Sequence, residues 1–438
     1  MKYTILSWVS IFTMLILLLM PFHAFLTVWA SSLIGHYTAL RLWKEVLLVL
    51  SAAGALYLIL TDHKIRTHTL SRRLVWLILA YMTLNIIWGL LALNQHDVTA
   101  KALGYGLIVN LRFLVFFLVT WAVALRMSRL RIHWQWMVYW PAMGVAAVGL
   151  LQIFVLPHDF LRHFGYGPNT IPAVETINHN SHYIRIASTL RGANPLGAYL
   201  LIPISLLAVL LLSPKRRTWL QAGFLAVLLF VLFFTFSRSA WIGGLLSIAV
   251  ILLLRVRTRA SRRVTVGIIA GLIVVAAGTT VAFHRSVRFE NFILHTQTHS
   301  AVKSTSNENH LNALKTNAKD IWHQPLGRGP GTAGPASVYN TGHTPRIAEN
   351  YFVQVAQETG WLGLALFALI NLGVGYLLWL RRADPLALSL FASLIGLTFI
   401  NLLSHAWADD TLAYVWWGLA GVAMAPNRKA ETAKPATE

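Results

Sequence analysis

The chain alternates between long apolar runs and mostly short polar connections up to about residue 424. Many of these runs approach the roughly twenty residues that an α-helix needs to cross the hydrocarbon core of a bilayer. We therefore predict an all-α, polytopic membrane protein with about twelve transmembrane helices. The expected spans are 4–30, 40–60, 74–94, 101–125, 134–156, 193–212, 218–236, 240–254, 264–283, 350–380, 385–404 and 411–424.

The first apolar run resembles a signal peptide, because Lys2 precedes a Leu-rich centre and Ala24 follows it. The run continues past Ala24 to Leu33, so an uncleaved first span is the preferred interpretation. Pro21 lies inside this run and predicts a bend in the helix.

Two longer polar stretches divide the chain, at 157–192 and at 284–349. They predict four parts: nine spans in 1–283 with the shorter polar segment 157–192 among them, a large loop or lid at 284–349, three spans in 350–424, and a tail at 425–438. Polar function in a membrane protein collects where the chain leaves the bilayer, so the large loop is expected to form part of an active site.

The charge distribution predicts the orientation of the chain. The sequence holds 36 Lys and Arg against 15 Asp and Glu, a net charge of +21. Most basic residues lie in short connections between apolar runs, which is the pattern of cytoplasmic loops and argues against nucleic-acid binding. An even number of spans then places both termini in the cytoplasm and both longer polar stretches outside, which is the periplasm for a bacterial inner membrane.

Several kinds of chemistry are excluded or disfavoured. The chain has no cysteine, so neither disulfides nor thiolate chemistry are available. No cytoplasmic loop is long enough for a domain, and no Gly-rich loop ending in Lys-Ser or Lys-Thr is present. An activated substrate must therefore arrive already energised, most simply on a lipid.

Arginines near the expected outer ends of the spans are the main candidates for substrate binding. No carboxylate occurs between Thr176 and Phe289, and a guanidinium without an acidic partner suits a phosphate or pyrophosphate. The alternative is that each of them reaches up to lipid headgroups. The candidates are Arg185, Arg191, Arg238, Arg285 and Arg288.

Two groups inside the expected spans add to this picture. Arg112 lies in the middle of a span, where it either faces a polar cavity or serves as a partner for backbone carbonyls. The span at 350–380 opens with polar residues on one helical face, which either bind sugar hydroxyls or border water. These residues are Asn350, Gln354, Gln357 and Glu358.

The large loop holds six histidines, but no pair has the close helical spacing of a metal site. His343, which precedes the polar face, is the best single candidate for a base. Asp409 and Asp410 either bind a divalent cation or cap the last helix, and capping is preferred. The run from Gly327 to Gly331 predicts a turn whose backbone approaches the substrate.

These motifs together resemble the O-antigen ligase and polymerase superfamily. The resemblance rests on Arg191-Gly-Ala-Asn-Pro195, Thr235-Phe-Ser-Arg238, the Pro325-Leu-Gly stretch, Asn350-Tyr351 and Gly360-Trp-Leu-Gly363. It implies an all-helical bundle related to lipid-dependent glycosyltransferases. For a ligase it implies transfer of a glycan from undecaprenyl pyrophosphate to a lipid A-core sugar hydroxyl at the periplasmic face.

The resemblance also implies roles for single residues. Arg191, with Arg238 and Arg288, corresponds to the arginines that hold the pyrophosphate. The family has His-Asn where this sequence has Glu349-Asn350, so the base is either His343 or Glu349 itself. A single displacement inverts the anomeric centre, and arginines supply the positive charge, so neither a metal nor another cofactor is required.

Other functions fit the same pattern. An O-antigen polymerase uses the same donor with another glycan as acceptor, and a protein O-oligosaccharyltransferase uses a protein. A flippase or transporter for a lipid-linked glycan is the alternative from another class, although the two related halves typical of transporters are not visible in the sequence.

Overall fold

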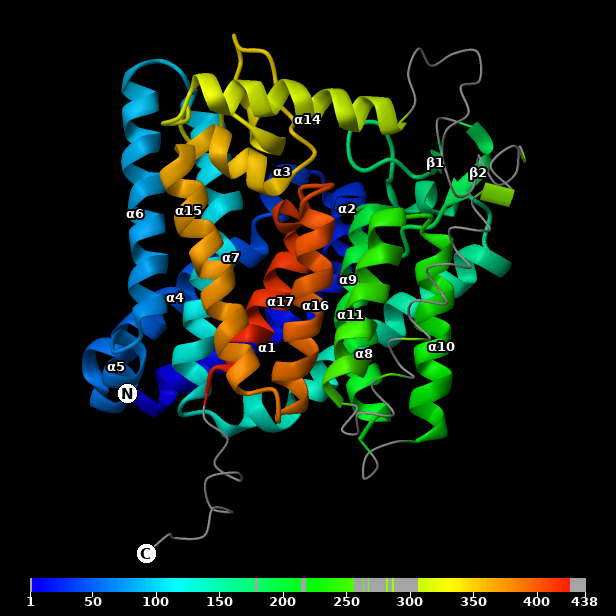
Figure 1. Ribbon diagram of the computed structural model, residues 1–438, viewed down its shortest axis with the longest axis horizontal. Coiled ribbons are helices and arrows are strands. Elements are labelled where there is room, and N and C mark those ends of the chain that lie inside the picture. Colours follow the sequence, from blue (N-terminus) through cyan, green and yellow to red (C-terminus); the bar gives the residue numbers. More distant parts are fainter. Residues whose placement is uncertain are drawn as a thin grey trace, which may run out of the picture.

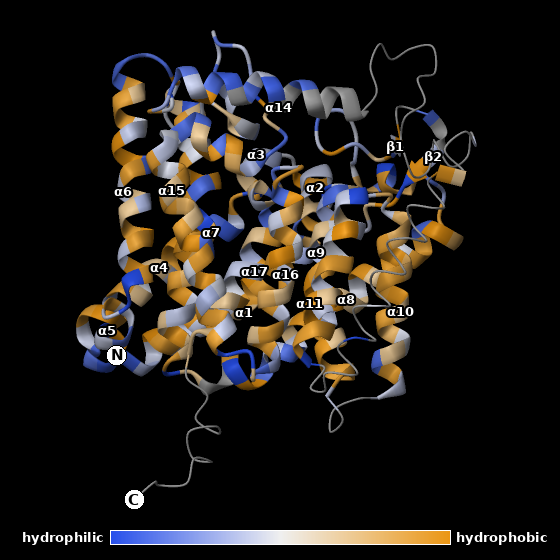
Figure 2. Ribbon diagram, viewed as in Figure 1, coloured by the Kyte–Doolittle hydropathy of each residue, from blue (hydrophilic) through white to orange (hydrophobic). Residues whose placement is uncertain are grey.

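The computed structural model is a bundle of long helices that is apolar through its middle and polar at both ends (Figures 1 and 2). It describes residues 2–177, 180–213, 218–255, 263, 267, 281–282, 286 and 306–425. The helices run roughly parallel to one another between the two polar ends. One end carries α14 and is called the α14 end below.

The helices begin and end close to the expected boundaries. The long helices are α1 (Lys2–Leu19), α2 (His23–Ile34), α4 (Trp43–Thr61), α6 (Arg73–Asn94), α7 (Ala100–Ala124), α8 (Ser128–Phe154), α9 (Ala193–Leu211), α10 (Trp219–Phe234), α11 (Arg238–Arg255), α14 (Ser306–His323), α15 (Tyr351–Leu380), α16 (Pro385–Asn401) and α17 (Asp410–Ala423). The shorter helices are η1 (Met20–Phe22), α3 (Tyr37–Leu40), α5 (His63–Leu70), η2 (Phe160–Phe164), η4 (Gly334–Tyr339) and η5 (Ala406–Ala408).

The predicted all-α membrane fold is confirmed. Among the described residues, eight helical segments are long and apolar enough to cross a membrane, and α10 and α16 are shorter apolar helices. The predicted number of twelve spans is not confirmed, and most of the expected span at 264–283 lies outside the described residues. The bend expected at Pro21 is present, because the short helix η1 separates α1 from α2.

The centre of the bundle consists of α7, α9 and α17. These helices are buried along most of their length, whereas α4, α6 and α11 bury only one face. Trp407, Trp416 and Trp417 pack against one another there, with ring centroids 5.2–5.7 Å apart, and Trp417 also contacts Phe113 of α7. This aromatic packing fixes the last helix in the middle of the protein.

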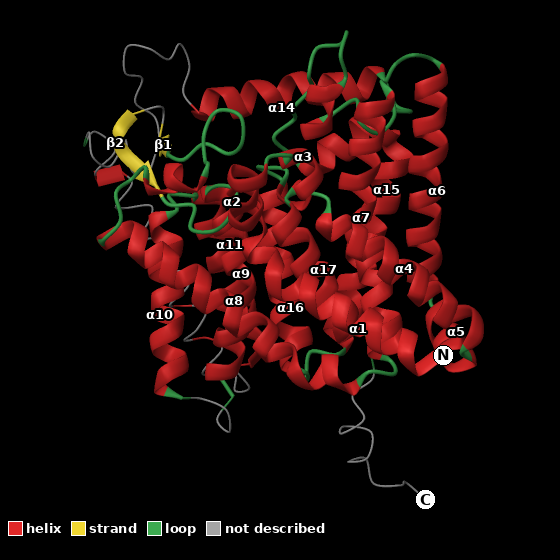
Figure 3. Ribbon diagram, turned by 180° about the vertical axis from the view of Figure 1, so that it is seen from behind, coloured by secondary structure: helices red, strands yellow, loops and turns green. Residues whose placement is uncertain are grey.

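The elements that lie outside the helical bundle are at the α14 end. Helix α14 lies across it, and the hairpin of β1 (Glu175–Ile177) and β2 (Asn180–Arg185) lies at one side (Figure 3). The N-terminus and the end of α17 lie at the opposite end. Ion pairs at that opposite end join Arg126 to Asp62 and Arg131 to Asp384.

Helix α15 is interrupted near its start. Gly360 has φ 68° and ψ −169°, so the helix is broken at this residue, as the sequence allowed. The break is filled by the preceding loop: the Trp361 amide donates to the Pro325 carbonyl, and the Gly329 amide donates to the Glu358 carbonyl. The loop that ends α14 is thereby attached to the first turns of α15.

Candidate functional site at the α14 end of the bundle

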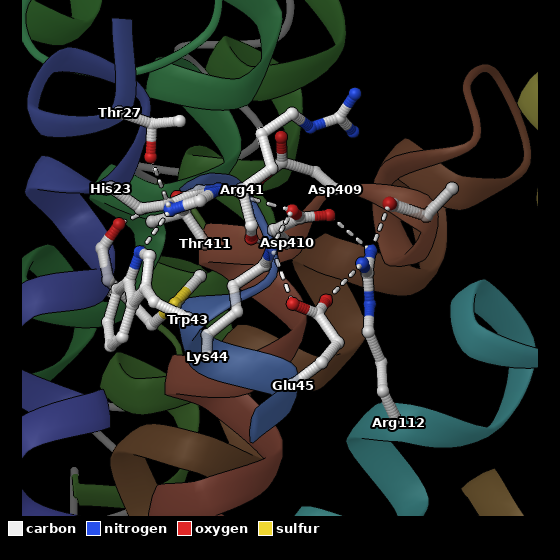
Figure 4. Close-up of polar contacts among 12 residues, drawn as sticks. His23, Thr27, Arg41, Trp43, Lys44, Glu45, Arg112, Asp409, Asp410 and Thr411 are labelled. Carbon is white, nitrogen blue, oxygen red and sulfur yellow. Dashed lines mark hydrogen bonds and ion pairs between the residues drawn. The ribbon is translucent and has the colours of Figure 1, made fainter. Parts of the chain in front are cut away.

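A cluster of charged side chains is buried where α4, α7 and α17 meet (Figure 4). Lys44 Nζ lies 3.0 Å from both Glu45 Oε2 and Asp410 Oδ2, and Arg112 contacts the same two carboxylates. Two positive and two negative charges therefore balance. Buried charges require such pairing, since the desolvation of an unpaired ion costs several kcal/mol.

His23 completes this cluster as a neutral ring. The Trp43 indole N–H donates to His23 Nδ1 at 2.9 Å, so Nδ1 carries no proton. The proton is then on Nε2, which lies 3.5 Å from Asp410 Oδ2. Across the cluster, Arg112 also donates to the Ala408 carbonyl at 2.7 Å. These contacts favour the structural role that the sequence left open for Arg112.

Two arginines next to this cluster have guanidinium groups that remain available. Within the described part of the chain, the guanidinium groups of Arg41 and Arg191 form neither a hydrogen bond nor an ion pair. Both act electrostatically on the Tyr37 hydroxyl, and Arg41 lies 5.6 Å from the centroid of that ring. Figure 4 shows the Arg41 guanidinium pointing away from the buried carboxylates. The α14 end therefore has a pair of arginines suited to an anion.

Arg191 is also close to the segment before α17. Burial raises the pKa of Asp409 above its ordinary value, and the positive charge of Arg191 opposes this rise. Asp409 accepts a hydrogen bond from the Leu412 amide at 3.1 Å, so it caps α17, as the sequence favoured. Arg191 is thus exposed to solvent and also lies close enough to Asp409 for their charges to interact.

Arg185 differs from the sequence-based expectation, because it has an acidic partner. The hairpin pairs Glu175 with Arg185, and the Arg185 guanidinium lies 4.0 Å from the Glu175 carboxylate. Glu175 also accepts a hydrogen bond from the Ala193 amide at 3.0 Å. The N-terminus of α9 is therefore occupied by a carboxylate of the protein itself.

The other expected phosphate ligands are placed differently. Arg238 begins α11 at the α14 end and is half-buried, close enough to Arg185 for their charges to interact. Arg288 lies outside the described residues, as does Arg285. The structure therefore brings Arg191 together with Arg41, and Arg238 together with Arg185.

The two candidate bases occupy unlike environments. His343 is exposed in the loop after η4, and its backbone amide donates to the Asn340 carbonyl at 3.2 Å. Glu349 is half-buried immediately before α15, and its φ of 50° is unusual for a residue other than glycine. Glu349 acts electrostatically on His405, which Arg191 also reaches. Of the two candidates, Glu349 is therefore the one linked to Arg191.

The polar residues that open α15 contact other parts of the protein. Asn350 caps the helix by accepting from the Val353 amide and donates to the Leu402 carbonyl. Gln357 donates to Asn317 at 2.8 Å and to Asp320 at 2.9 Å, both on α14. Gln354 is buried against Gly334. A role in binding sugar hydroxyls stays a prediction for all three glutamine and asparagine side chains.

The glycine run 327–331 packs against helices of the bundle. A Cβ on Gly331 would lie 2.3 Å from the Ala102 carbonyl oxygen, and one on Gly329 would lie 2.4 Å from Ala92. Gly327, Gly329 and Gly331 all have positive φ. Gly329 and Gly331 are therefore required for contact with α6 and α7, and Gly327 for contact with α15, whereas the sequence had suggested contact with substrate.

Two residues of this region were not identified from the sequence. Arg41 stands at the outer end of the expected span 40–60, whereas most basic residues were expected on the cytoplasmic side. An arginine on the outer side was therefore a signal in the sequence that could have identified it. His405 follows the expected end of α16 and gives no motif. Only the fold places it beside Glu349 and Arg191.

No group of three or more His, Asp or Glu side chains suited to a metal ion occurs in the part of the chain that the structure describes. The site thus combines one exposed arginine and one half-buried arginine with a half-buried carboxylate and a half-buried imidazole at one end of a membrane bundle. Such a site suits a multi-pass membrane protein that binds an anionic lipid-linked substrate at the edge of the bilayer.

Comparison with known protein families agrees with this class. Residues 223–368, from within α10 to within α15, match the family model described as O-Antigen ligase. No curated protein matches the chain. The family match confirms the resemblance to the O-antigen ligase and polymerase superfamily and supports a membrane enzyme that transfers glycosyl groups.

Proposed function

We propose that the protein is an O-antigen ligase that transfers a glycan from undecaprenyl pyrophosphate to a sugar hydroxyl of lipid A-core. The observation that carries the proposal is the pair Arg41 and Arg191, whose guanidinium groups have no hydrogen bond or ion pair with any described residue at the α14 end. The matched family segment supports the reaction type. In this proposal the α14 end faces the periplasm of a bacterial inner membrane and both termini face the cytoplasm.

The reaction needs charge stabilisation more than acid catalysis, because pyrophosphate is a good leaving group. The acceptor hydroxyl oxygen attacks the anomeric carbon, and the bond from that carbon to the phosphate oxygen breaks. The electron pair stays on the phosphate, where Arg191 and Arg41 stabilise the growing negative charge. The hydroxyl proton passes to a base, and a single displacement inverts the anomeric centre.

The geometry favours Glu349 over His343 as this base. Glu349 is linked electrostatically to His405 and through it to Arg191, whereas His343 lies exposed in a separate loop. Glu349→Gln and His343→Ala separate the two, because the variant that keeps full transfer activity excludes its residue as the base. We expect the loss with Glu349→Gln.

The function is tested with the full-length protein in proteoliposomes that contain glycan-loaded undecaprenyl pyrophosphate. Lipid A-core, a polymer repeat unit and a protein are offered as acceptors in separate assays. We expect transfer to lipid A-core. Transfer only to the repeat unit or to protein would favour the polymerase or the oligosaccharyltransferase, and lipid translocation without transfer would favour a flippase.

Arg191 provides the matched test of the site. Arg191→Ala should lower transfer by roughly 100-fold or more, the usual cost of removing a group that stabilises transition-state charge. Arg191→Lys should retain part of the activity, because lysine keeps the charge but lacks the two-pronged guanidinium. Arg162→Ala removes an exposed arginine of η2 that pairs with Asp159 and serves as the control. Full activity in Arg191→Ala contradicts the proposal.

A further inference from the structure

The segment before α17 lies alongside the start of α15. The Asn350 side chain donates to the Leu402 carbonyl at 2.9 Å, and the Tyr351 amide donates to the Ser404 carbonyl at 3.2 Å. These two hydrogen bonds hold residues 402–405 against residues 349–351. They bring His405 next to Glu349, although more than fifty residues separate the two in sequence.

His405 lies between charges of opposite sign. The pKa of His405 is lowered to about 4, chiefly by burial; the positive charge of Arg191 also lowers it, and Glu349 opposes the shift. The ring is therefore neutral near pH 7 and offers one N–H donor and one nitrogen acceptor.

The ring of His405 makes no polar contact that would explain its position in the fold. It forms no hydrogen bond with any residue that the structure describes, and its Nδ1 atom is buried. A buried polar atom without a partner destabilises the fold, and a functional role is one reason for such an atom to persist. His23 is the contrast, because Trp43 and Asp410 contact both of its nitrogens.

The backbone at Glu349 is strained in the same place. Glu349 has a φ of 50°, a conformation that is unfavourable for a residue with a side chain and that clusters at functional sites. The strained conformation is fixed by the adjacent Asn350, which caps α15 and bonds to Leu402. The two hydrogen-bonded segments thus set the position of both the carboxylate and the imidazole.

We propose that His405 binds the acceptor hydroxyl together with Glu349 and holds it toward the Arg191 site. The proposal rests on the function proposed above and assigns the acceptor-binding residue of that same site. The hydroxyl donates its hydrogen to the Glu349 carboxylate and accepts a hydrogen bond from the imidazole N–H. Its remaining lone pair attacks the anomeric carbon, the proton moves to Glu349, and the glycosyl–phosphate electron pair leaves with the pyrophosphate. His405 neither gains nor loses a proton in the step.

The test measures transfer to lipid A-core while the acceptor concentration is varied at saturating donor, and while the donor concentration is varied at saturating acceptor. His405→Leu should lower kcat by about 100-fold, in the range of a hydrogen-bonding group at the reacting atom, and should raise the acceptor KM. The donor KM should stay within about twofold, because Arg191 and Arg41 are unchanged. His405→Gln supplies an N–H donor of similar reach, so its kcat should be about tenfold higher than that of His405→Leu. His323→Leu removes an exposed histidine of α14 and is the control.

A second measurement uses the unmodified protein, so it does not depend on the folding of a variant. Diethyl pyrocarbonate modifies neutral imidazoles, and mass spectrometry reports the rate at each histidine. Lipid A-core should slow modification of His405 and leave His323 unaffected. Equal rates at His405 with and without the acceptor would overturn the proposal.

The outcomes separate this proposal from the function itself. Wild-type kinetics in His405→Leu, together with loss of activity in Arg191→Ala, would reject His405 and keep the ligase. A change confined to the donor KM would also reject it, because it would place His405 on the donor side. Absence of transfer by the wild-type protein to every acceptor would reject the function.

Discussion

The carboxylate of Glu358 on α15 accepts a hydrogen bond from the Gly331 amide at 2.7 Å. Its other oxygen accepts from the Asn110 side chain of α7 at 2.7 Å. Glu358 is fully buried, so one side chain attaches the glycine run to two helices of the bundle. The loop between α14 and α15 is therefore held by the interior of the protein.

Removing this carboxylate should loosen the loop. Glu358→Ala leaves the Gly331 amide and the Asn110 amide without their acceptor, at a cost of about 2–4 kcal/mol. We expect faster proteolysis at 324–349 in the purified protein and a lower Tm. Glu358→Gln keeps one oxygen acceptor, so its proteolysis rate and its Tm should lie between those of the wild-type protein and Glu358→Ala. Unchanged proteolysis in Glu358→Ala would show that other contacts hold the loop.

Two glycines on α7 provide a matched test of how closely the loop approaches. A Cβ on Gly106 would lie 2.3 Å from the Gly331 nitrogen, whereas one on Gly104 meets nothing within 4 Å. Gly106→Ala should displace the loop and lower transfer activity, while Gly104→Ala should be neutral or slightly stabilising, because alanine favours helix. Transfer rates and Tm of the two variants give the comparison; equal behaviour would contradict the close packing.

The buried ion cluster should show strong coupling between its members. Asp410→Asn leaves Lys44 and Arg112 with one carboxylate, and breaking a buried ion pair typically costs about 3–5 kcal/mol. Lys44→Met with Asp410→Asn restores a balance of one positive and one negative charge. We expect the double variant to be more stable than Asp410→Asn alone, measured by thermal unfolding in detergent. A double variant less stable than either single one would show that the charges act independently.

Arg41 should affect the donor more than the acceptor. Arg41→Ala removes one of the two guanidinium groups near Tyr37 and should raise the KM for the pyrophosphate donor about tenfold, with little change in the acceptor KM. Arg66→Ala, at the exposed opposite end, tests for a general effect of charge. An equal effect of both substitutions would remove Arg41 from the site.

Stability should fall in mild acid because of His405. Its pKa of about 4 in the folded protein lies below the ordinary value of 6.5, so the folded state binds fewer protons than the unfolded state between these values. Stability therefore decreases as the pH falls from about 6.5 toward 4. His405→Gln should make the Tm less dependent on pH over that window, and an unchanged pH dependence would contradict the assignment.

The helices could be predicted closely because hydrophobic length alone determines them in a membrane. The expected spans 74–94, 101–125 and 193–212 each agree within one residue with α6, α7 and α9. The break in α15 falls at Gly360, the first residue of the Gly360-Trp-Leu-Gly363 motif, because glycine tolerates that conformation.

The partners of the charged residues could not be predicted in the same way. Arg185 was expected to lack an acid, but the hairpin returns the chain to Glu175, just outside the acid-free interval. The buried pairs join α4 to α17 across most of the sequence, so no local pattern reveals them. His405 meets Glu349 for the same reason. The packing of segments far apart in the sequence determines these contacts. Neither the composition of the chain nor the spacing of its motifs predicts that packing.

The balanced charges of the cluster also have a consequence for biogenesis. Lys44 and Arg112 are synthesised hundreds of residues before Asp410, the carboxylate that contacts them both. Thr411 also donates to the carbonyl of Met20 in η1, so the start of α17 is joined to the short helix between α1 and α2. Until the ribosome and the insertion machinery deliver α17, Lys44 and Arg112 have only the Glu45 carboxylate to pair with, so one positive charge is unbalanced among the early helices. A nascent chain stopped before Asp410 is therefore a natural target for membrane quality control.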